Sequence, residues 1–368
     1  MTADVTRCPH CDAEVHDGDR YCEACGYDLV TGTEAEAQAP AGAPEARWLS
    51  SGRTEEVCAG CGGSSFGDEG YCDGCGRRRA TGHDHSELDL DVIAAASDIG
   101  HRHRHNEDAV GIGLLPGGGG RPGIVAGVVC DGVSSSDRAD AASYAAVDAA
   151  VPALLDALRE EPGDPGRALE LAAGAAQAAA ALAAGSEPGT NPPSSTFVAA
   201  VVTAEAVTVG WVGDSRAYWL PDPLPADAPT AAARPAGEGT VGLNPVCLTA
   251  DDSVAGRAAA AGGPPVGAAH PAGPAGALVR WLGADATDTD PHLLTVRPTG
   301  PGRVLVCSDG LFRYRPEPAE LADATPSGTP MDVARTLVEL ALAAGGEDNI
   351  SVAVLPFPPS SVTSPSAT

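Results

Sequence analysis

The chain has 368 residues, enough for one large domain and one small one. It carries 50 acidic and 22 basic residues, and because lysine is absent all the basic residues are arginines. The resulting formal net charge of −28 excludes a general binder of nucleic acid or of anionic membranes, since both need a basic surface.

The amino-terminal sequence "MTADVTRCPHC" lacks the charged and then apolar pattern of an export signal. No continuous apolar run reaches the roughly 20 residues of a membrane helix. We therefore expect a cytoplasmic protein with no membrane partner. In that reducing setting, cysteines are more often metal ligands than disulfides.

Eight of the eleven cysteines lie within the first 85 residues, in two quartets that repeat with a period of 50 residues. Within each quartet, ten residues separate two CxxC pairs. The quartets are Cys8, Cys11, Cys22 and Cys25, and Cys58, Cys61, Cys72 and Cys75. Four thiolates suit a tetrahedral, structural Zn²⁺ site. We predict two zinc ribbons, at residues 1–31 and 57–79, whose folding depends on metal. Disulfides or an iron site are the alternatives.

The segments between these parts have the composition of linkers. Residues 32–56 are rich in Ala, Pro, Gly and Glu, and residues 80–88 form a second short linker. Trp48 is the exception, and we expect it to dock on a ribbon or on the main domain.

From residue 89 to residue 357 the sequence predicts one large domain with strands and helices. Six Val- and Ile-rich runs are typical of buried strands: "VIAAAS", "GIVAGVVC", "TFVAAVVT", "AVTVGWVG", "RVLVCS" and "ISVAVLP". Ala-rich segments predict helices at 137–160 and 165–184, with a break or kink at Pro152. We predict a long loop at residues 221–278 and a disordered tail at residues 358–368.

Several predicted strands end at an aspartate. Asp131, Asp214 and Asp309 each follow a strand, and Asp348 precedes the last one. If those strand ends lie side by side, the carboxylates form an acidic cluster that needs a cation to stay ionised. Oxygen ligands of this kind favour Mg²⁺ or Mn²⁺.

The motifs along residues 89–357 resemble those of the metal-dependent protein phosphatases, the PPM or type 2C serine/threonine family, in their bacterial form. In chain order they are "SDIG" and "NEDA" (97–109), "VVCDGVSSSDRADAAS" (128–143), "SSTFVAAVV" (194–202), "WVGDSRAYWL" (211–220), "LTADDS" (248–253), "RWLGAD" (280–285), "VLVCSDGLF" (304–312) and "GGEDNISVAVL" (345–355). Each motif is weak by itself, but these eight stretches of the chain (97–109 counted as one) in the expected order make a specific match.

The resemblance implies an α+β fold, a four-layer α-β-β-α sandwich with two metal ions at one end of the sheets. The implied ligands of two Mn²⁺ or Mg²⁺ ions are Asp131, which bridges them, the Gly132 carbonyl, Asp309 and Asp348. By the same resemblance, Asp108 holds a metal-bound water and Asp214 helps to bind a third, weaker ion. The four catalytic carboxylates are then Asp108, Asp131, Asp309 and Asp348.

The implied reaction is hydrolysis of phosphoserine or phosphothreonine by a water that bridges the two metal ions, without a phosphoenzyme. The substrate is then a phosphoprotein, the product of a bacterial Ser/Thr kinase. The zinc ribbons serve as a targeting module for an unknown protein partner. A non-catalytic adaptor on a phosphatase fold is the alternative function. A nucleic-acid module is disfavoured by the acidic balance.

Three positions depart from the family pattern. Where many relatives have a phosphate-gripping Arg, this chain has His103, flanked by Arg102 and Arg104. Val133 stands where some eukaryotic relatives have a histidine acid. Arg313 replaces an Asp that often completes the third metal site, which puts that site in doubt.

The stretch "HRHRHNED" at 101–108 could hold a metal or an anion, or be only a solvated turn. Because aspartates supply the metal ligands elsewhere, we interpret it as a phosphate-binding edge. If residues 101–105 are extended, His103 lies on one face and the two arginines on the other. We expect one of these three side chains to contact phosphate, with His103 ahead. The remaining cysteines and tryptophans in this domain read as core residues.

Overall fold

The structure is a computed structural model, and it divides into two units, residues 1–45 and residues 46–368. It describes residues 5–7, 14–16, 27–28, 33–34, 46–51, 64–65, 67, 73–74, 84–117, 123–185, 191–222, 239–262 and 273–359. All eight cysteines of the two quartets lie outside these residues, so the zinc sites stay predictions.

The described part of the first unit consists of two short antiparallel strand pairs. β1 (Val5–Arg7) pairs with β2 (Glu14–His16), and β3 (Tyr27–Asp28) pairs with β4 (Thr33–Glu34). The second pair continues past residue 31, where the sequence predicts the end of the first ribbon.

The second unit is built on two sheets. The seven-stranded sheet has the order β14-β17-β12-β11-β9-β8-β5, and the six-stranded sheet has the order β15-β13-β18-β19-β7-β6. The strands of the first are β5 (Arg47–Ser50), β8 (Asp108–Leu115), β9 (Ile124–Asp131), β11 (Phe197–Val202), β12 (Val207–Val212), β14 (Gly239–Val241) and β17 (His292–Pro298). Those of the second are β6 (His85–Asp89), β7 (Ala94–Asp98), β13 (Arg216–Pro221), β15 (Val246–Cys247), β18 (Gly302–Cys307) and β19 (Ile350–Phe357). β10 (Ser194–Ser195) and β16 (Leu282–Gly283) form a separate small pair.

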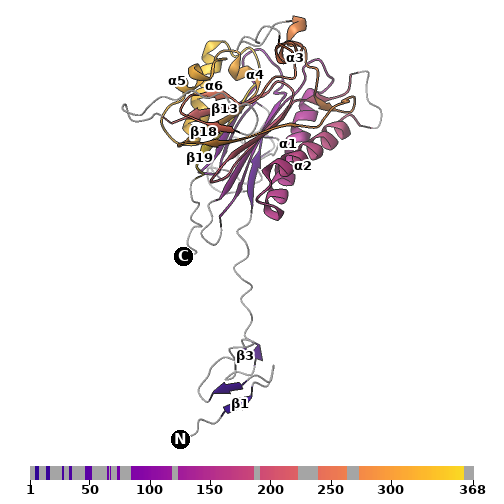
Figure 1. Ribbon diagram of the computed structural model, residues 1–368. Helices are drawn as coiled ribbons and strands as arrows, with labels where there is room; N and C mark the ends of the chain where they lie inside the picture. Colours follow the sequence, from indigo (N-terminus) through magenta and orange to yellow (C-terminus); the bar gives the residue numbers. More distant parts are fainter. Residues whose placement is uncertain are drawn as a thin grey trace. The chain divides into compact units, whose positions relative to one another are not determined.

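The helices cover the outer faces of the two sheets (Figure 1). α1 (Ala139–Glu160) and α2 (Pro165–Ala183) pack on the seven-stranded sheet. α4 (Asp309–Phe312), α5 (Pro318–Ala324) and α6 (Pro330–Ala344) pack on the other. α3 (Val254–Ala260) and a 3₁₀ turn (Gly273–Gly276) lie in the segment predicted as one long loop, which therefore contains regular elements. The four-layer sandwich is confirmed.

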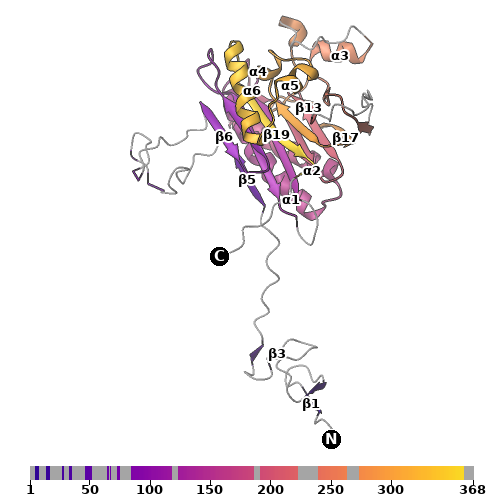
Figure 2. The same cartoon turned by 90° about the vertical axis from the view of Figure 1, so that its left-hand side faces the viewer.

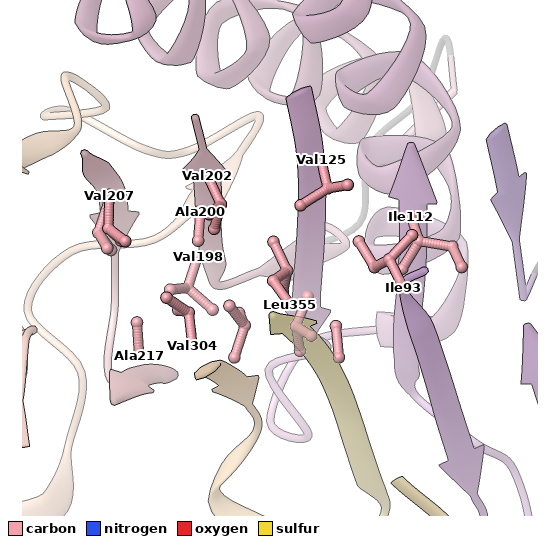
Figure 3. Close-up of a cluster of buried hydrophobic side chains, with 14 of the residues drawn as sticks. Ile93, Ile112, Val125, Val198, Ala200, Val202, Val207, Ala217, Val304 and Leu355 are labelled. Atoms are coloured by element: carbon pink, nitrogen blue, oxygen red, sulfur yellow. The ribbon is translucent and has the colours of Figure 1, made fainter. Parts of the chain in front are cut away.

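A third apolar cluster fills the space between the sheets (Figure 3). Ile93, Ile112, Val125, Val198 and Leu355 are among its buried members. Because both faces of the central strands are covered, these strands are apolar throughout, which is why their sequences stand out as continuous Val- and Ile-rich runs.

Two glycines on β8 allow α1 to approach the sheet closely. Side chains two residues apart share one face of a strand, so Gly111 and Gly113 both face the helix. A Cβ at Gly111 would lie 2.7 Å from methyl groups of Val147 and Val151, and one at Gly113 would lie 2.8 Å from Leu155. The other face of β8 carries larger apolar residues into the space between the sheets.

The two predicted helices are confirmed within two residues at each end. Asp164 caps α2, where its Oδ1 accepts a hydrogen bond from the Arg167 N–H at 2.9 Å. The expected break at Pro152 is wrong, because α1 continues through it. Burial of its apolar face outweighs the one missing backbone hydrogen bond. α1 is long and apolar enough to cross a membrane by composition, but it packs against α2 and the sheet as a core helix.

Two segments that the sequence assigns to linkers form edge strands instead (Figure 2). β5 pairs with β8, and β6 pairs with β7. Ser50 Oγ donates to Asp148 Oδ1 at 2.5 Å, which ties β5 to α1. Trp48 packs on the helix-covered side of its sheet, so it docks on the main domain. Ordered structure therefore begins before the predicted boundary at residue 89.

Candidate active site

The ends of the central strands bring five aspartates to one edge of the sandwich. Asp108 begins β8 and Asp131 ends β9, and the two residues are paired in register. Asp214 follows β12, Asp309 follows β18, and Asp348 precedes β19. Because neighbouring strands run antiparallel, the start of one lies beside the end of the next, and acidic residues far apart in sequence become neighbours.

A cleft of about 540 Å³ opens at this edge. Four of the aspartates line it: Asp131, Asp214, Asp309 and Asp348. Gly132, Val133, Trp281 and Asp285 also line the cleft. Trp281 is therefore part of the cleft and only partly buried, unlike the core position expected from its sequence.

Asp108 lies behind the cleft with its carboxyl group buried. It is 1% exposed, and its Oδ2 accepts a hydrogen bond from Ser308 Oγ at 2.6 Å. Burial is the main cause that raises the pKa of Asp108 to about 7, with added repulsion from Asp348 and Asp309 and an opposing effect of the Ser308 hydrogen bond.

Burial and repulsion between carboxylates also raise the pKa values of the neighbouring Asp131, Asp214 and Asp348. Burial raises the pKa of Asp131 well above the usual range, and repulsion from Asp108, Asp309, Asp348 and Asp214 raises it further. Burial and the charge of Asp309 likewise raise the pKa values of Asp214 and Asp348. The protein alone does not offset the repulsion among these carboxylates, and bound cations would reduce that repulsion.

The chemistry of the donors fits Mn²⁺ or Mg²⁺, because carboxylate and carbonyl oxygens are the ligands of hard cations. Within the described ranges, however, no three acidic, imidazole or thiol groups lie close enough to hold one ion between them. Asp309 and Asp348 are instead joined through a cation of the protein. Arg313 Nη2 lies 3.0 Å from Asp309 Oδ2 and 2.9 Å from Asp348 Oδ2.

The loop at 101–107 consists of turns and bends and does not form a strand. The alternation of faces expected for an extended segment is therefore wrong. His103 is partly buried, with Nε2 3.1 Å from Asp348 Oδ1. Arg102 lies more exposed, with Nη2 2.7 Å from Glu347 Oε1. Arg104 is exposed, and none of the described residues forms an ion pair with it.

Asn349 fixes this loop, a role that the sequence did not reveal. Its Nδ2 donates to the Ile99 carbonyl at 2.8 Å and to the His105 carbonyl at 3.2 Å. Its Oδ1 accepts from the Glu107 N–H at 2.8 Å. The only feature of the sequence that points to a role for Asn349 is its position next to Asp348 at the start of a strand. Asn349 therefore couples the loop that carries His103 to the loop that carries Asp348.

A buried ionic cluster fixes the turn that carries Asp214. Asp252 Oδ2 accepts hydrogen bonds from the Gly213 N–H at 3.1 Å and from Arg280 Nη1 at 3.2 Å. His292 Nε2 lies 2.9 Å from Asp252 Oδ1. The sequence around His292 indicates no role for it, because its partners Asp252 and Arg280 lie in other segments of the chain.

The cysteines of this domain take no part in the site. Cys130 and Cys307 are fully buried, and burial raises the pKa of both thiols. Cys247 is partly buried, with its thiol next to Thr249. All three are packing residues, as their positions in apolar strands indicate.

The pKa of Asp108 predicts a pH effect on the stability of the metal-free protein. Between its ordinary value of 3.8 and about 7, the folded state keeps the proton that the unfolded state releases. Unfolding then releases a proton, so the free energy of unfolding should fall as pH rises, by about 1 kcal/mol per pH unit, and level off above pH 7.

Asp108→Asn supplies the control, because it keeps the shape of the side chain but lacks this titrating group. Urea unfolding in chelator from pH 5 to 8 should show the wild type losing stability relative to the variant up to about pH 7. A stability difference that does not change with pH would contradict the prediction.

Comparison with known proteins agrees with this geometry. Residues 100–241 match the family model described as protein phosphatase 2C, and residues 8–76 match the double zinc ribbon model. No curated protein matches the chain significantly.

Solved structures show the same fold over most of the second unit. The Mycobacterium tuberculosis serine/threonine phosphatase PstP is 25% identical with a TM-score of 0.50, over 71% of this chain and 96% of that one. The PPM Ser-Thr phosphatase MsPP of Mycobacterium smegmatis gives the same values. Staphylococcus aureus Stp1, also a serine/threonine phosphatase, shares the fold at 22% identity with a TM-score of 0.56, over 73% of this chain and 96% of that one. Residues 100–241 are therefore similar to the protein phosphatase 2C family, and residues 8–76 are similar to a double zinc ribbon.

Proposed function

We propose that this chain is a protein serine/threonine phosphatase that hydrolyses phosphoserine and phosphothreonine at the cleft lined by Asp131, Asp309 and Asp348. The observation that carries the proposal is the convergence of these buried carboxylates on one cleft within a phosphatase fold. Their raised pKa values indicate a site built for cations.

In this proposal, Asp131, the Gly132 carbonyl, Asp309 and Asp348 hold two Mn²⁺ or Mg²⁺ ions. Such ions would supply positive charge that stabilises the phosphate in the transition state and lowers the pKa of the attacking water. The protein supplies the arrangement of the ligands. Hydrogen bonds fix Asp131 from both sides, since its N–H donates to Thr196 Oγ1 at 3.0 Å and its carbonyl accepts from the Thr196 N–H at 2.7 Å.

Asp108 is placed to orient water rather than to ligate directly. Ser308 donates to its Oδ2 at 2.6 Å and Ser351 also hydrogen-bonds to its carboxyl group, so the Asp108 side chain is held in place behind the cleft. The partly buried Trp281, which also lines the cleft, would offer an apolar surface to the peptide around the phosphorylated residue. Val133 provides no proton donor, so the leaving oxygen must take its proton from water or from another residue.

Release of phosphate from a phosphothreonine peptide tests the proposal. We expect hydrolysis with Mn²⁺ or Mg²⁺ and none after chelation. A protein that is inert with both ions but still binds a phosphoprotein would instead support the adaptor function.

His103 is expected to contact the substrate phosphate, because it is the partly buried member of the three candidates and lies against Asp348. His103→Ala should raise the KM about tenfold, which equals about 1.4 kcal/mol of lost binding. Arg102→Ala and Arg104→Ala should have smaller effects, since both side chains are more exposed.

Steady-state kinetics of the three variants, with Arg159→Ala as a control on a distant exposed arginine, measures this difference. If His103→Ala leaves both KM and kcat unchanged, phosphate contact belongs to one of the arginines.

The zinc ribbons are proposed to recruit a protein partner, and the substrate to be a phosphoprotein made by a bacterial Ser/Thr kinase in the cytoplasm. Residues 1–45 form a unit of their own, which supports a separate role. Deleting them should reduce turnover of the physiological phosphoprotein while leaving turnover of a short phosphopeptide unchanged. Equal turnover of the phosphoprotein by both forms would remove the targeting role of the first ribbon.

A further inference from the structure

Two of the carboxylates that line the cleft, Asp309 and Asp348, are already paired with a cation of the protein, Arg313. Arg313 directly follows α4, one helical turn after Asp309, and this spacing brings the two side chains together. Its Nη2 also reaches Asp348, which lies on a different loop before β19. One guanidinium nitrogen thus bridges two carboxylates that the proposed function assigns to metal.

The neighbours of Arg313 fix its position. Phe312 is fully buried, and the Arg216 guanidinium lies 4.0 Å from the centre of its ring. Tyr314 accepts a hydrogen bond at its hydroxyl from the Glu347 N–H at 2.8 Å. Since the residues on both sides are anchored, the backbone of Arg313 is held in place beside Asp309 and Asp348.

The contacts of Arg313 indicate what this arginine does. An arginine is positively charged at all working pH values, and its Nη2 lies 3.0 Å from Asp309 Oδ2 and 2.9 Å from Asp348 Oδ2. A third divalent ion beside these two carboxylates would meet the guanidinium directly, and the two positive charges would repel each other.

We propose that Arg313 is a built-in counter-cation that takes the place of a third divalent ion, so that the cleft binds two metal ions and not three. This inference rests on the proposed function, because it concerns the same metal centre. It removes the role expected for Asp214 in a third site.

The number of bound Mn²⁺ ions tests the inference without any substrate. The full chain, saturated with Zn²⁺, is titrated with Mn²⁺, and free Mn²⁺ is followed by electron paramagnetic resonance. We expect two Mn²⁺ per chain for the wild type and three for Arg313→Asp, which exchanges the cation for a carboxylate. Arg159→Asp makes the same change of charge on the exposed end of α1 and should still bind two.

Three bound ions in the wild type, or two in a folded Arg313→Asp variant, would overturn the inference. Fewer than two in the wild type would instead overturn the proposed two-ion centre, so the two failures are distinct. Circular dichroism establishes whether each variant is folded. If Arg313→Asp does not fold, Arg313→Asn removes the cation with less added repulsion and should gain a third, weaker Mn²⁺, and its failure to do so would count against the inference.

Discussion

Asp131→Asn is expected to abolish phosphate release while making the metal-free protein more stable. The substitution keeps the size and hydrogen-bonding shape of the side chain but removes the charge at the centre of the cluster. Because Asp131 is proposed to hold both cations, hydrolysis should fall by at least about 10³-fold, a loss of about 4 kcal/mol of transition-state stabilisation. The burial that raises the pKa of Asp131 means that its charge destabilises the metal-free fold, so removing it should raise the melting temperature in chelator.

Two measurements on one variant make this prediction specific. Phosphopeptide turnover with Mn²⁺ should be lost, and thermal unfolding in chelator should shift upward. Asp156→Asn, on the exposed face of α1 beside Arg159, should change neither quantity appreciably. Normal turnover by Asp131→Asn would contradict the assigned site, and a lower melting temperature in chelator would contradict the electrostatic argument.

Gly310→Ala is expected to unfold the phosphatase domain or to destabilise it severely. A Cβ at this position would lie 1.9 Å from the carbonyl oxygen of Asn349 and 2.9 Å from its carbonyl carbon. Backbone atoms are the obstacle, and they belong to the residue that fixes the His103 loop, so the clash has no flexible side chain to absorb it. The loss should be about 3 kcal/mol or more, seen as a large drop in melting temperature or as insoluble protein.

Gly174→Ala provides the matched control in the same domain. Gly174 lies within α2, and a Cβ there would meet no atom within 4 Å. Alanine favours a helix over glycine by about 1 kcal/mol, so this variant should be slightly more stable than the wild type. If the two substitutions shift the melting temperature equally, close packing at Gly310 is not what requires a glycine.

The strands and helices at the centre of the domain could be predicted because each is covered on both faces or on a broad apolar face. Such burial leaves continuous Val- and Ile-rich runs, as in β9 and β19, and long Ala-rich segments, as in α1 and α2. The gathering of Asp131, Asp309 and Asp348 in one cleft also followed from their places at strand ends.

Features that depend on partners distant in the chain could not be predicted. β5 and β6 are short, and their pairing with β8 and β7 is what makes them strands. Likewise, no local pattern shows that Asn349 reaches the His105 carbonyl or that Ser308 donates to Asp108. The bends at 101–107 follow from these contacts, which is why an extended reading of that segment was wrong.

The second cysteine quartet lies in the segment of chain between the two edge strands β5 and β6. The Ser51 N–H donates to the Val110 carbonyl at 2.9 Å on one sheet, and the Asp84 carbonyl accepts from the Ile99 N–H at 2.9 Å on the other. The residues at both ends of the segment 52–83 are therefore hydrogen-bonded to the second unit. The entropy lost when the two ends of a segment are held in place is smaller for a shorter flexible segment. A metal ion that cross-links cysteines of this segment would shorten its flexible part and so stabilise the pairing of both edge strands. Trimming the chain at residue 89 would instead remove both strands and uncover the unpaired edges of β8 and β7, which are sites for aggregation.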